Sequence, residues 1–220
     1  MVIELAAVFM VLILPPLLTT KGNGISKAAE FSPYVVIQFF TAAVLFYQNS
    51  RLSIKSNAGE NKGKIPAVIR NLFWFSMGLG SLMLVFACTQ TLSLIFHLGI
   101  TADPVPPGLE VKHFYNWIFL FLAISTGAFY EEVLYRLFFP SFMHGIFDKK
   151  NKILFYFVEL ISVLIFAFSH RYLGMISVLN AFFCGIILRL CLSRSKSLFP
   201  GFLAHFTYNI SLIVFSQLMP

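Results

Sequence analysis

The sequence predicts an all-α, polytopic helical membrane protein with about seven transmembrane helices (six to eight). Of its 220 residues, 58% are hydrophobic and 11% are charged, and the mean hydropathy is +0.83. Soluble domains contain only about 45–50% apolar residues. The apolar residues also form continuous runs rather than the alternating pattern of a membrane β-barrel, and only helices or closed barrels satisfy their backbone in lipid.

Seven apolar segments follow one another along the chain and are the expected spans. No Lys or Arg precedes the first segment, so we expect a retained span, bent at Pro15 and Pro16, rather than a signal peptide. A polar connection at 49–70 follows the second segment, and a proline-rich stretch at 103–108 precedes the fourth. The segments cover residues 2–20, 33–48, 71–97, 114–143, 153–170, 173–192 and 199–217.

The net charge of +7 is explained by lysines and arginines in the loops. With seven spans, eleven basic residues fall on one side and four on the other, and an excess of Lys and Arg marks the cytoplasmic side. The N-terminus is then cytoplasmic. The eleven include Arg189, counted with Arg194 and Lys196 around one loop. The chain has no basic, aromatic-rich polar domain, so we expect no nucleic-acid partner.

Glu131, Glu132 and Arg136 lie inside a long apolar run and are the most informative residues of the chain. A charged side chain near the bilayer centre costs at least about 2.5–3.5 kcal/mol, so such residues usually serve a function. On a helix, Glu132 and Arg136 share a face at i, i+4 and can pair, whereas Glu131 is rotated away and can remain free. Helix-packing contacts are the structural alternative.

Two further polar interruptions follow. His170 ends the next apolar segment, where an interfacial or capping role is the simpler reading. His205 and Asn209 lie within the last segment and share a helix face at i, i+4, which by itself suggests interhelical hydrogen bonding. Together with the glutamates, they form a set suited to water-mediated amide cleavage: a carboxylate base, an imidazole, and donors for a tetrahedral oxyanion.

These residues form three motifs, Glu131-Glu132-x-x-x-Arg136, Phe166-x-x-x-His170 and His205-x-x-x-Asn209. They resemble the signatures of the CAAX prenyl protease and bacteriocin-processing family of intramembrane endopeptidases (CPBP, also called Abi). The stretches at 180–185 and 197–205 are also similar to that family. The resemblance covers about residues 114–212. It implies one membrane domain, with N-terminal helices without diagnostic motifs at 1–113 and a catalytic core at 114–217.

The resemblance implies a role for each motif residue. Glu131 would be the general base for the attacking water, with His170 beside it, and His205 and Asn209 would form the oxyanion hole. Glu132 and Arg136 would be the supporting pair. The family is described both as metal-independent glutamate proteases and as metalloproteases. We favour a metal-free site, because Asn209 suits an oxyanion donor better than a zinc ligand. If the enzyme needs zinc, the ligands would be Glu131, His170 and His205.

The expected function is therefore an intramembrane endopeptidase that cleaves a membrane-associated protein or peptide. The family name suggests a prenylated CAAX substrate, although no feature of the sequence reports prenyl binding. The lipid bilayer is the other expected partner, and the expected location is a bacterial inner (plasma) membrane. The main alternative is a non-catalytic membrane immunity or partner-binding protein of the same family. A small transporter is a third possibility, but it would more naturally show inverted repeats.

Glu159 and His144 are two of the ionisable residues that lie outside these motifs. Glu159 lies in an apolar run, where it could pack against the site or lie at the membrane interface. His144 flanks an apolar segment, and we expect an interfacial position for it.

Overall fold

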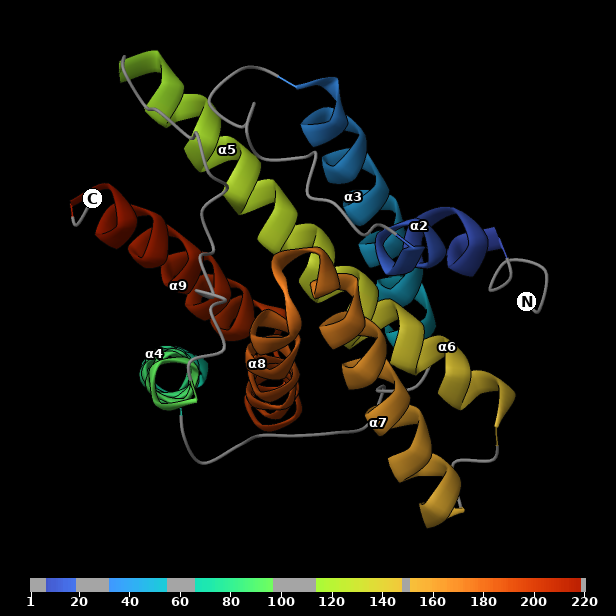
Figure 1. Ribbon diagram of the computed structural model, residues 1–220. Helices are drawn as coiled ribbons and strands as arrows, with labels where there is room; N and C mark the ends of the chain where they lie inside the picture. The colour runs from blue at the N-terminus through green and yellow to red at the C-terminus, as the bar shows by residue number, and fades with distance from the viewer. Residues whose placement is uncertain (1–6, 19–31, 55–65, 97–113, 148–150, 219–220) are drawn as a thin grey trace.

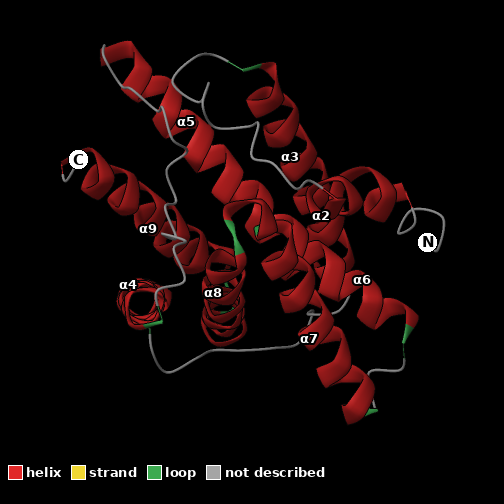
Figure 2. Ribbon diagram, in the orientation of Figure 1, coloured by secondary structure: helices red, strands yellow, loops and turns green. Residues whose placement is uncertain are grey.

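The computed structural model describes residues 7–18, 32–54, 66–96, 114–147 and 151–218, and these are almost entirely helical (Figures 1 and 2). No strand occurs in this part of the chain. Five of the described helices are long and apolar enough to cross a membrane, namely Ala67–Ile95, Phe114–Ile146, Lys152–Ser169, Met175–Ser195 and Leu198–Ser216. The predicted fold class is confirmed: the chain is a polytopic helical membrane protein.

The two N-terminal segments differ from the other expected spans. A short apolar helix covers Phe9–Leu18, with a π-helical turn η1 (Phe9–Ile13) followed by α2 (Leu14–Leu18). Pro15 and Pro16 lie in α2, just after the change from π-helical to α-helical geometry. Proline lacks the backbone N–H donor that an α-helix uses in its interior. The second segment lies in the 22-residue helix α3 (Pro33–Ile54), which is not among the five candidate spans.

The central span is one long helix that changes type in the middle. It begins as α5 (Phe114–Glu131), becomes π-helical over η2 (Glu132–Phe138), and ends as α6 (Phe139–Ile146). Together these segments make a candidate span of 33 residues. Within soluble and membrane proteins alike, π-helical turns are rare and often occur at functional sites. Here the π-helical stretch carries Glu132 and Arg136.

The last three helices are joined by tight turns. The side chain of Asn151 caps the start of α7 by accepting hydrogen bonds from two backbone N–H groups. Gly174 has a φ of 100°, a backbone conformation that favours glycine, and it joins α7 to α8 through the short helix η3. The bounds of these elements are Lys152–Ser169 for α7, Arg171–Leu173 for η3, Met175–Ser195 for α8 and Leu198–Leu218 for α9.

Helix α8 lies near the middle of the bundle, where it contacts α7, α9, η2 and α4 (Ala67–Ile95) (Figure 1). Helix α3 packs along α5 on the other side. One buried apolar cluster surrounds η2 and joins it to α3, α7 and α8, while a second joins α4, α8 and α9. The π-helical stretch is thereby enclosed by other helices, and the charges it carries are shielded from lipid.

Candidate active site

Glu132 and Arg136 form a buried ion pair in η2, as their i, i+4 spacing predicts. Arg136 Nε lies 3.5 Å from Glu132 Oε1, and the two side chains are only 3% and 1% exposed. Removing Glu132 would leave Arg136 as a buried charge without its carboxylate, and removing Arg136 would leave the buried Glu132 without its guanidinium, so either loss is strongly destabilising. Glu132 is therefore engaged by a structural partner.

His205 lies between the two glutamates, although 73 positions separate it from Glu132 in the sequence. Its Nδ1 lies 2.9 Å from Glu132 Oε1, and its Nε2 lies 3.6 Å from Glu131 Oε2. An ionised carboxylate only accepts hydrogen bonds, so His205 donates from Nδ1 to Glu132. The Glu131 side chain is 29% exposed. The structure thus separates a buried carboxylate with two partners from an accessible one.

The ring of Phe166, on α7, lies against several site residues. The guanidinium carbon of Arg136 lies 3.6 Å from its centroid, which is a cation–π contact. The His170 ring lies 4.7 Å from the same ring, and the His205 ring lies 6.3 Å away, both in edge-on geometry. Phe166 thereby connects α7 to motif residues on two other helices. This role was not predicted, and the only signal for it was the place of Phe166 at the start of its motif.

His170 follows the last residue of α7. Its Nδ1 lies 2.9 Å from the Phe166 carbonyl oxygen, so Nδ1 carries the hydrogen and Nε2 is the acceptor of the neutral ring. Burial lowers the pKa of His170, and the nearby Glu131 carboxylate opposes this effect in part. His170 is therefore neutral near pH 7, and it lies within electrostatic reach of Glu131.

Asn209 lies one turn after His205 on α9 and is half-buried. Within the described parts of the chain, its side chain makes no hydrogen bond to the other motif residues. Its spacing still puts it on the His205 face of the helix, and its amide carries two donors. Its place in an oxyanion hole stays a prediction.

The described residues do not fit a zinc site. Among them, no three His, Cys, Asp or Glu side chains are grouped so that they could hold a metal ion. The alternative ligand set of Glu131, His170 and His205 does not form such a group, whereas a catalytic zinc ion takes three protein ligands at about 2.0–2.2 Å. No step proposed below runs through a metal.

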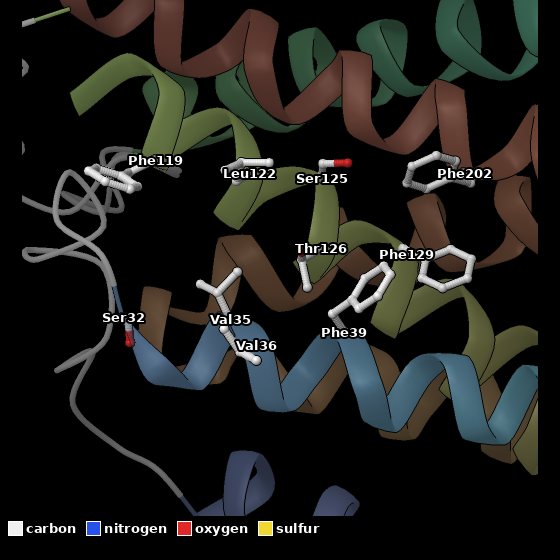
Figure 3. A pocket seen from close by; sticks show the side chains of 10 residues that line it. All are labelled: Ser32, Val35, Val36, Phe39, Phe119, Leu122, Ser125, Thr126, Phe129 and Phe202. Atoms are coloured by element: carbon white, nitrogen blue, oxygen red, sulfur yellow. The ribbon is translucent and has the colours of Figure 1, made fainter. Parts of the chain in front are cut away.

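A largely apolar cavity of about 510 Å³ lies between α3, α5 and α9 (Figure 3). Its lining includes Val36 and Phe39 from α3, Leu122 and Phe129 from α5, and Phe202 from α9. The rings of Phe129 and Phe202 lie 5.7 Å apart and sit together at one end of the view in Figure 3. None of the predicted site residues lines the cavity. However, Phe129 lies two positions before Glu131 of the first motif, and Phe202 lies three positions before His205 of the third.

Three polar residues outside the motifs form a second cluster. Arg189 lies inside α8, where it forms an ion pair with Glu159, so it does not belong in the count of loop charges. Glu159 also binds His144, whose Nε2 lies 2.9 Å from Glu159 Oε1. The side chain of His144 is only 8% exposed because it packs inside the bundle and is held by Glu159, whereas its interfacial position stays a prediction. The sequence signal for this second cluster was the presence of Arg189 in one apolar run and of Glu159 in another.

Residues 113–211, slightly less than half of the chain, match the family model described as type II CAAX prenyl endopeptidase Rce1-like. No curated protein and no solved structure matches the chain significantly. The matched segment contains every predicted site residue, and it supports a CAAX-protease type of intramembrane endopeptidase at the level of the family. Residues 113–211 are therefore similar to the Rce1-like type II CAAX prenyl endopeptidases, and this similarity supports the family that the three motifs predict.

Proposed function

We propose that this protein is an intramembrane endopeptidase in which Glu131 is the general base that activates water. The observation that carries the proposal is the different environment of the two adjacent glutamates. Glu132 is 1% exposed and is held by Arg136 and His205, whereas the side chain of Glu131 is 29% exposed. A general base must reach the proton it removes, and Glu131 is the accessible carboxylate of the pair.

In the proposed reaction, Glu131 takes a proton from water as the oxygen attacks the carbonyl carbon of the scissile peptide bond. The electron pair of the carbonyl moves to its oxygen and forms a tetrahedral oxyanion. Donors from His205 and Asn209 stabilise that charge. When the C–N bond breaks, the proton passes from Glu131 to the leaving amine, and neutral His170 assists this transfer from beside Glu131.

The charge balance of the cluster is consistent with these roles. For Nε2 of His205 to donate to an oxyanion while Nδ1 remains bonded to Glu132, the ring must carry both hydrogens. Its charge and that of Arg136 then balance the two carboxylates. The Glu132 oxygen Oε1 contacts both Arg136 Nε and His205 Nδ1, which gives Glu132 a supporting role in the site.

The substrate we propose is a peptide at the membrane surface that carries an apolar group, such as a prenylated CAAX peptide. The cavity of about 510 Å³ between α3, α5 and α9 has an apolar lining and a size typical of ligand pockets, which are about 300–1,000 Å³. It ends near the helical turns that carry Glu131 and His205. A bacterial inner membrane remains the proposed location.

The test is cleavage by the purified protein in detergent micelles. The substrates are peptides of one CAAX-type sequence in prenylated and unprenylated form, together with a library of membrane peptides. Wild type is compared with Glu131→Gln and with Glu60→Gln, a matched loss of a carboxylate in the polar connection outside the matched family segment. Each protein is assayed with and without a chelator, and a melting curve checks that each variant is folded.

We expect wild type and Glu60→Gln to cleave, and folded Glu131→Gln to be inactive. Faster cleavage of the prenylated peptide would support the substrate class. Full activity of Glu131→Gln would show that Glu131 is not the general base. Loss of wild-type activity with chelator, restored by zinc, would contradict the metal-free mechanism. Absence of cleavage of every peptide would favour the non-catalytic immunity or partner-binding alternative.

A further inference from the structure

A proline interrupts the backbone hydrogen bonding of the long helix just after its motif residues. In an α-helix the carbonyl of Arg136 would accept from the N–H of residue 140, but this residue is Pro140, which has no N–H. The proline ring also clashes with the carbonyl four residues earlier. The helix is widened in this region, where the N–H of Phe139 bonds to the carbonyl of Leu134, five residues back. The Arg136 carbonyl therefore lacks its α-helical donor at the point where the π-helical stretch passes into α6.

Arg189 of α8 supplies a donor to this carbonyl. Its Nη1 donates to the carbonyl oxygen of Arg136 at 2.6 Å, across 53 positions of sequence. An unsatisfied backbone carbonyl is costly in a membrane interior, where no bulk water can take the place of the missing donor. The bond from Arg189 therefore satisfies a backbone carbonyl of the long helix, in addition to joining that helix to α8.

The guanidinium of Arg189 is held on its other side by Glu159 of α7. Its Nε and Nη2 both donate to the carboxylate, with Nη2 2.6 Å from Oε1, and the other bond runs from Nε to Oε2. His144 of α6 binds the same carboxylate, and its ring stacks on that of Phe155, with the centroids 4.6 Å apart. The planar fork of arginine suits this arrangement, because two of its edges bind two acceptors in fixed directions.

The capped residue is also a residue of the site. The carbonyl of Arg136 is fixed by Arg189, while its side chain pairs with Glu132 at 3.5 Å and covers the ring of Phe166. A change in the backbone at Arg136 would therefore move the carboxylate that holds His205. Since loss of alignment by about 1 Å can cost about 100-fold in rate, this backbone position matters for catalysis.

From this geometry we infer that Arg189 is a positioning residue of the active site: anchored by Glu159, it caps the Arg136 carbonyl, which Pro140 leaves without its α-helical N–H donor. The cap holds the π-helical stretch that presents Glu132 and Arg136. This inference rests on the proposed function for its effect on turnover, but the capping contact can be measured independently of cleavage.

A simple charge-pair role for Arg189 makes a different prediction. If Arg189 only neutralised Glu159, residue 140 would have no influence on the effect of losing it. If Arg189 replaces a missing backbone donor, then Pro140→Ala, which restores an N–H at that position, reduces the need for Arg189. The two substitutions therefore form a double-mutant cycle for the cap.

The experiment compares wild type, Arg189→Gln, Pro140→Ala and the double variant. The control is Arg194→Gln, which removes an exposed arginine from the same helix. For each protein, kcat and KM are measured on the peptide that wild type cleaves best, and the melting temperature is measured in the same detergent. Arg189→Lys is made as a second probe, because it keeps a cation but cannot bind Glu159 with a fork.

We expect Arg189→Gln to lower kcat by about tenfold or more, with KM changed less than about threefold, and to lower the melting temperature. Pro140→Ala in the same chain is expected to restore most of both losses, while Arg194→Gln matches wild type. Arg189→Lys is expected to be intermediate and to respond to Pro140→Ala in the same way.

Equal losses with and without Pro140→Ala would overturn the inference, as would an unchanged kcat in folded Arg189→Gln. If Arg189→Gln does not fold in either background, the same comparison is made with Arg189→Lys, and a lack of rescue there would also overturn it. If wild type cleaves no peptide, the proposed function fails, and the melting temperatures of the same proteins still decide whether Arg189 caps the helix.

Discussion

The Nδ1 atom of His205 lies 2.9 Å from Oε1 of Glu132, and this hydrogen bond joins the last helix to the π-helical stretch. The same carboxylate oxygen lies 3.5 Å from Arg136 Nε. One buried oxygen thus holds a residue of the proposed oxyanion hole and is itself held by a guanidinium. The stability and the activity of the protein are therefore expected to depend on the same few contacts.

Arg136→Ala is expected to destabilise the protein and to inactivate it. The substitution leaves Glu132 buried without its guanidinium, and breaking a buried pair in this way costs about 3–5 kcal/mol. The measurement is thermal unfolding in detergent together with the cleavage rate. Arg194→Ala is the control, because that arginine is exposed and its loss should change stability by less than about 1 kcal/mol. A melting temperature equal to that of wild type would show that the pair does not matter for stability.

Asn209→Ala is expected to reduce kcat by about 100- to 1,000-fold, the usual effect of losing an oxyanion donor. KM should change little, because the donor acts on charge that develops only in the transition state. Steady-state kinetics of the purified variant provide the test. Thr207→Ala, a polar truncation on the same helix, is expected to retain most activity. A reduction in kcat of less than about threefold for Asn209→Ala would exclude this role.

Gly185→Ala is expected to impair the site through Phe166. A Cβ at this position would lie 3.2 Å from Phe166 Cδ1 and 3.2 Å from Val163 Cγ1, which is tighter than ordinary van der Waals contact. Overpacking of this kind costs about 1–3 kcal/mol, and it would displace the ring that contacts Arg136 and His170.

The measurements for Gly185→Ala are kcat and the melting temperature, with Gly80→Ala as the matched control. A Cβ at Gly80 meets no atom within 4 Å, so this variant should be active and at least as stable as wild type. Equal behaviour of the two alanine variants would show that the site tolerates movement of Phe166.

The titration of His170 predicts how stability changes with pH. Its pKa is lowered in the folded protein by burial, whereas the unfolded chain has the ordinary value of about 6.5. Below that pH the unfolded state binds more protons than the folded state, so this contribution to stability is complete above about pH 6.5 and is lost as the pH falls toward the lowered pKa.

We therefore expect the melting temperature of wild type to fall between pH 7 and pH 5, and His170→Gln to make this fall smaller. The two proteins are compared by thermal unfolding in the same detergent and salt. The same pH dependence in both would mean that His170 does not contribute to it.

Much of this protein follows from local features of its sequence. Continuous apolar runs predict membrane helices, because lipid leaves helices and closed barrels as the only spanning structures. The pairing of Glu132 with Arg136 follows from i, i+4 spacing on one helix. The order of the three motifs also predicted the family, and the match over residues 113–211 supports this prediction.

Other relationships depend on which helix faces meet, and local spacing does not determine that. The sequence places His205 on a helix but does not show that it lies between Glu131 and Glu132. It also marks Arg189 only as a basic residue near a loop, whereas packing brings its side chain to a backbone carbonyl on another helix.

The sequence by itself therefore determined the class of fold, the family resemblance and the identity of the ionisable motif residues, because apolar runs and helical spacing are properties of neighbouring residues. Only the tertiary structure decided which carboxylate is buried, which is accessible, and which donor caps the Arg136 carbonyl. The physical reason is that the burial and hydrogen bonding of a side chain depend on packed helices whose contacts come from distant parts of the chain.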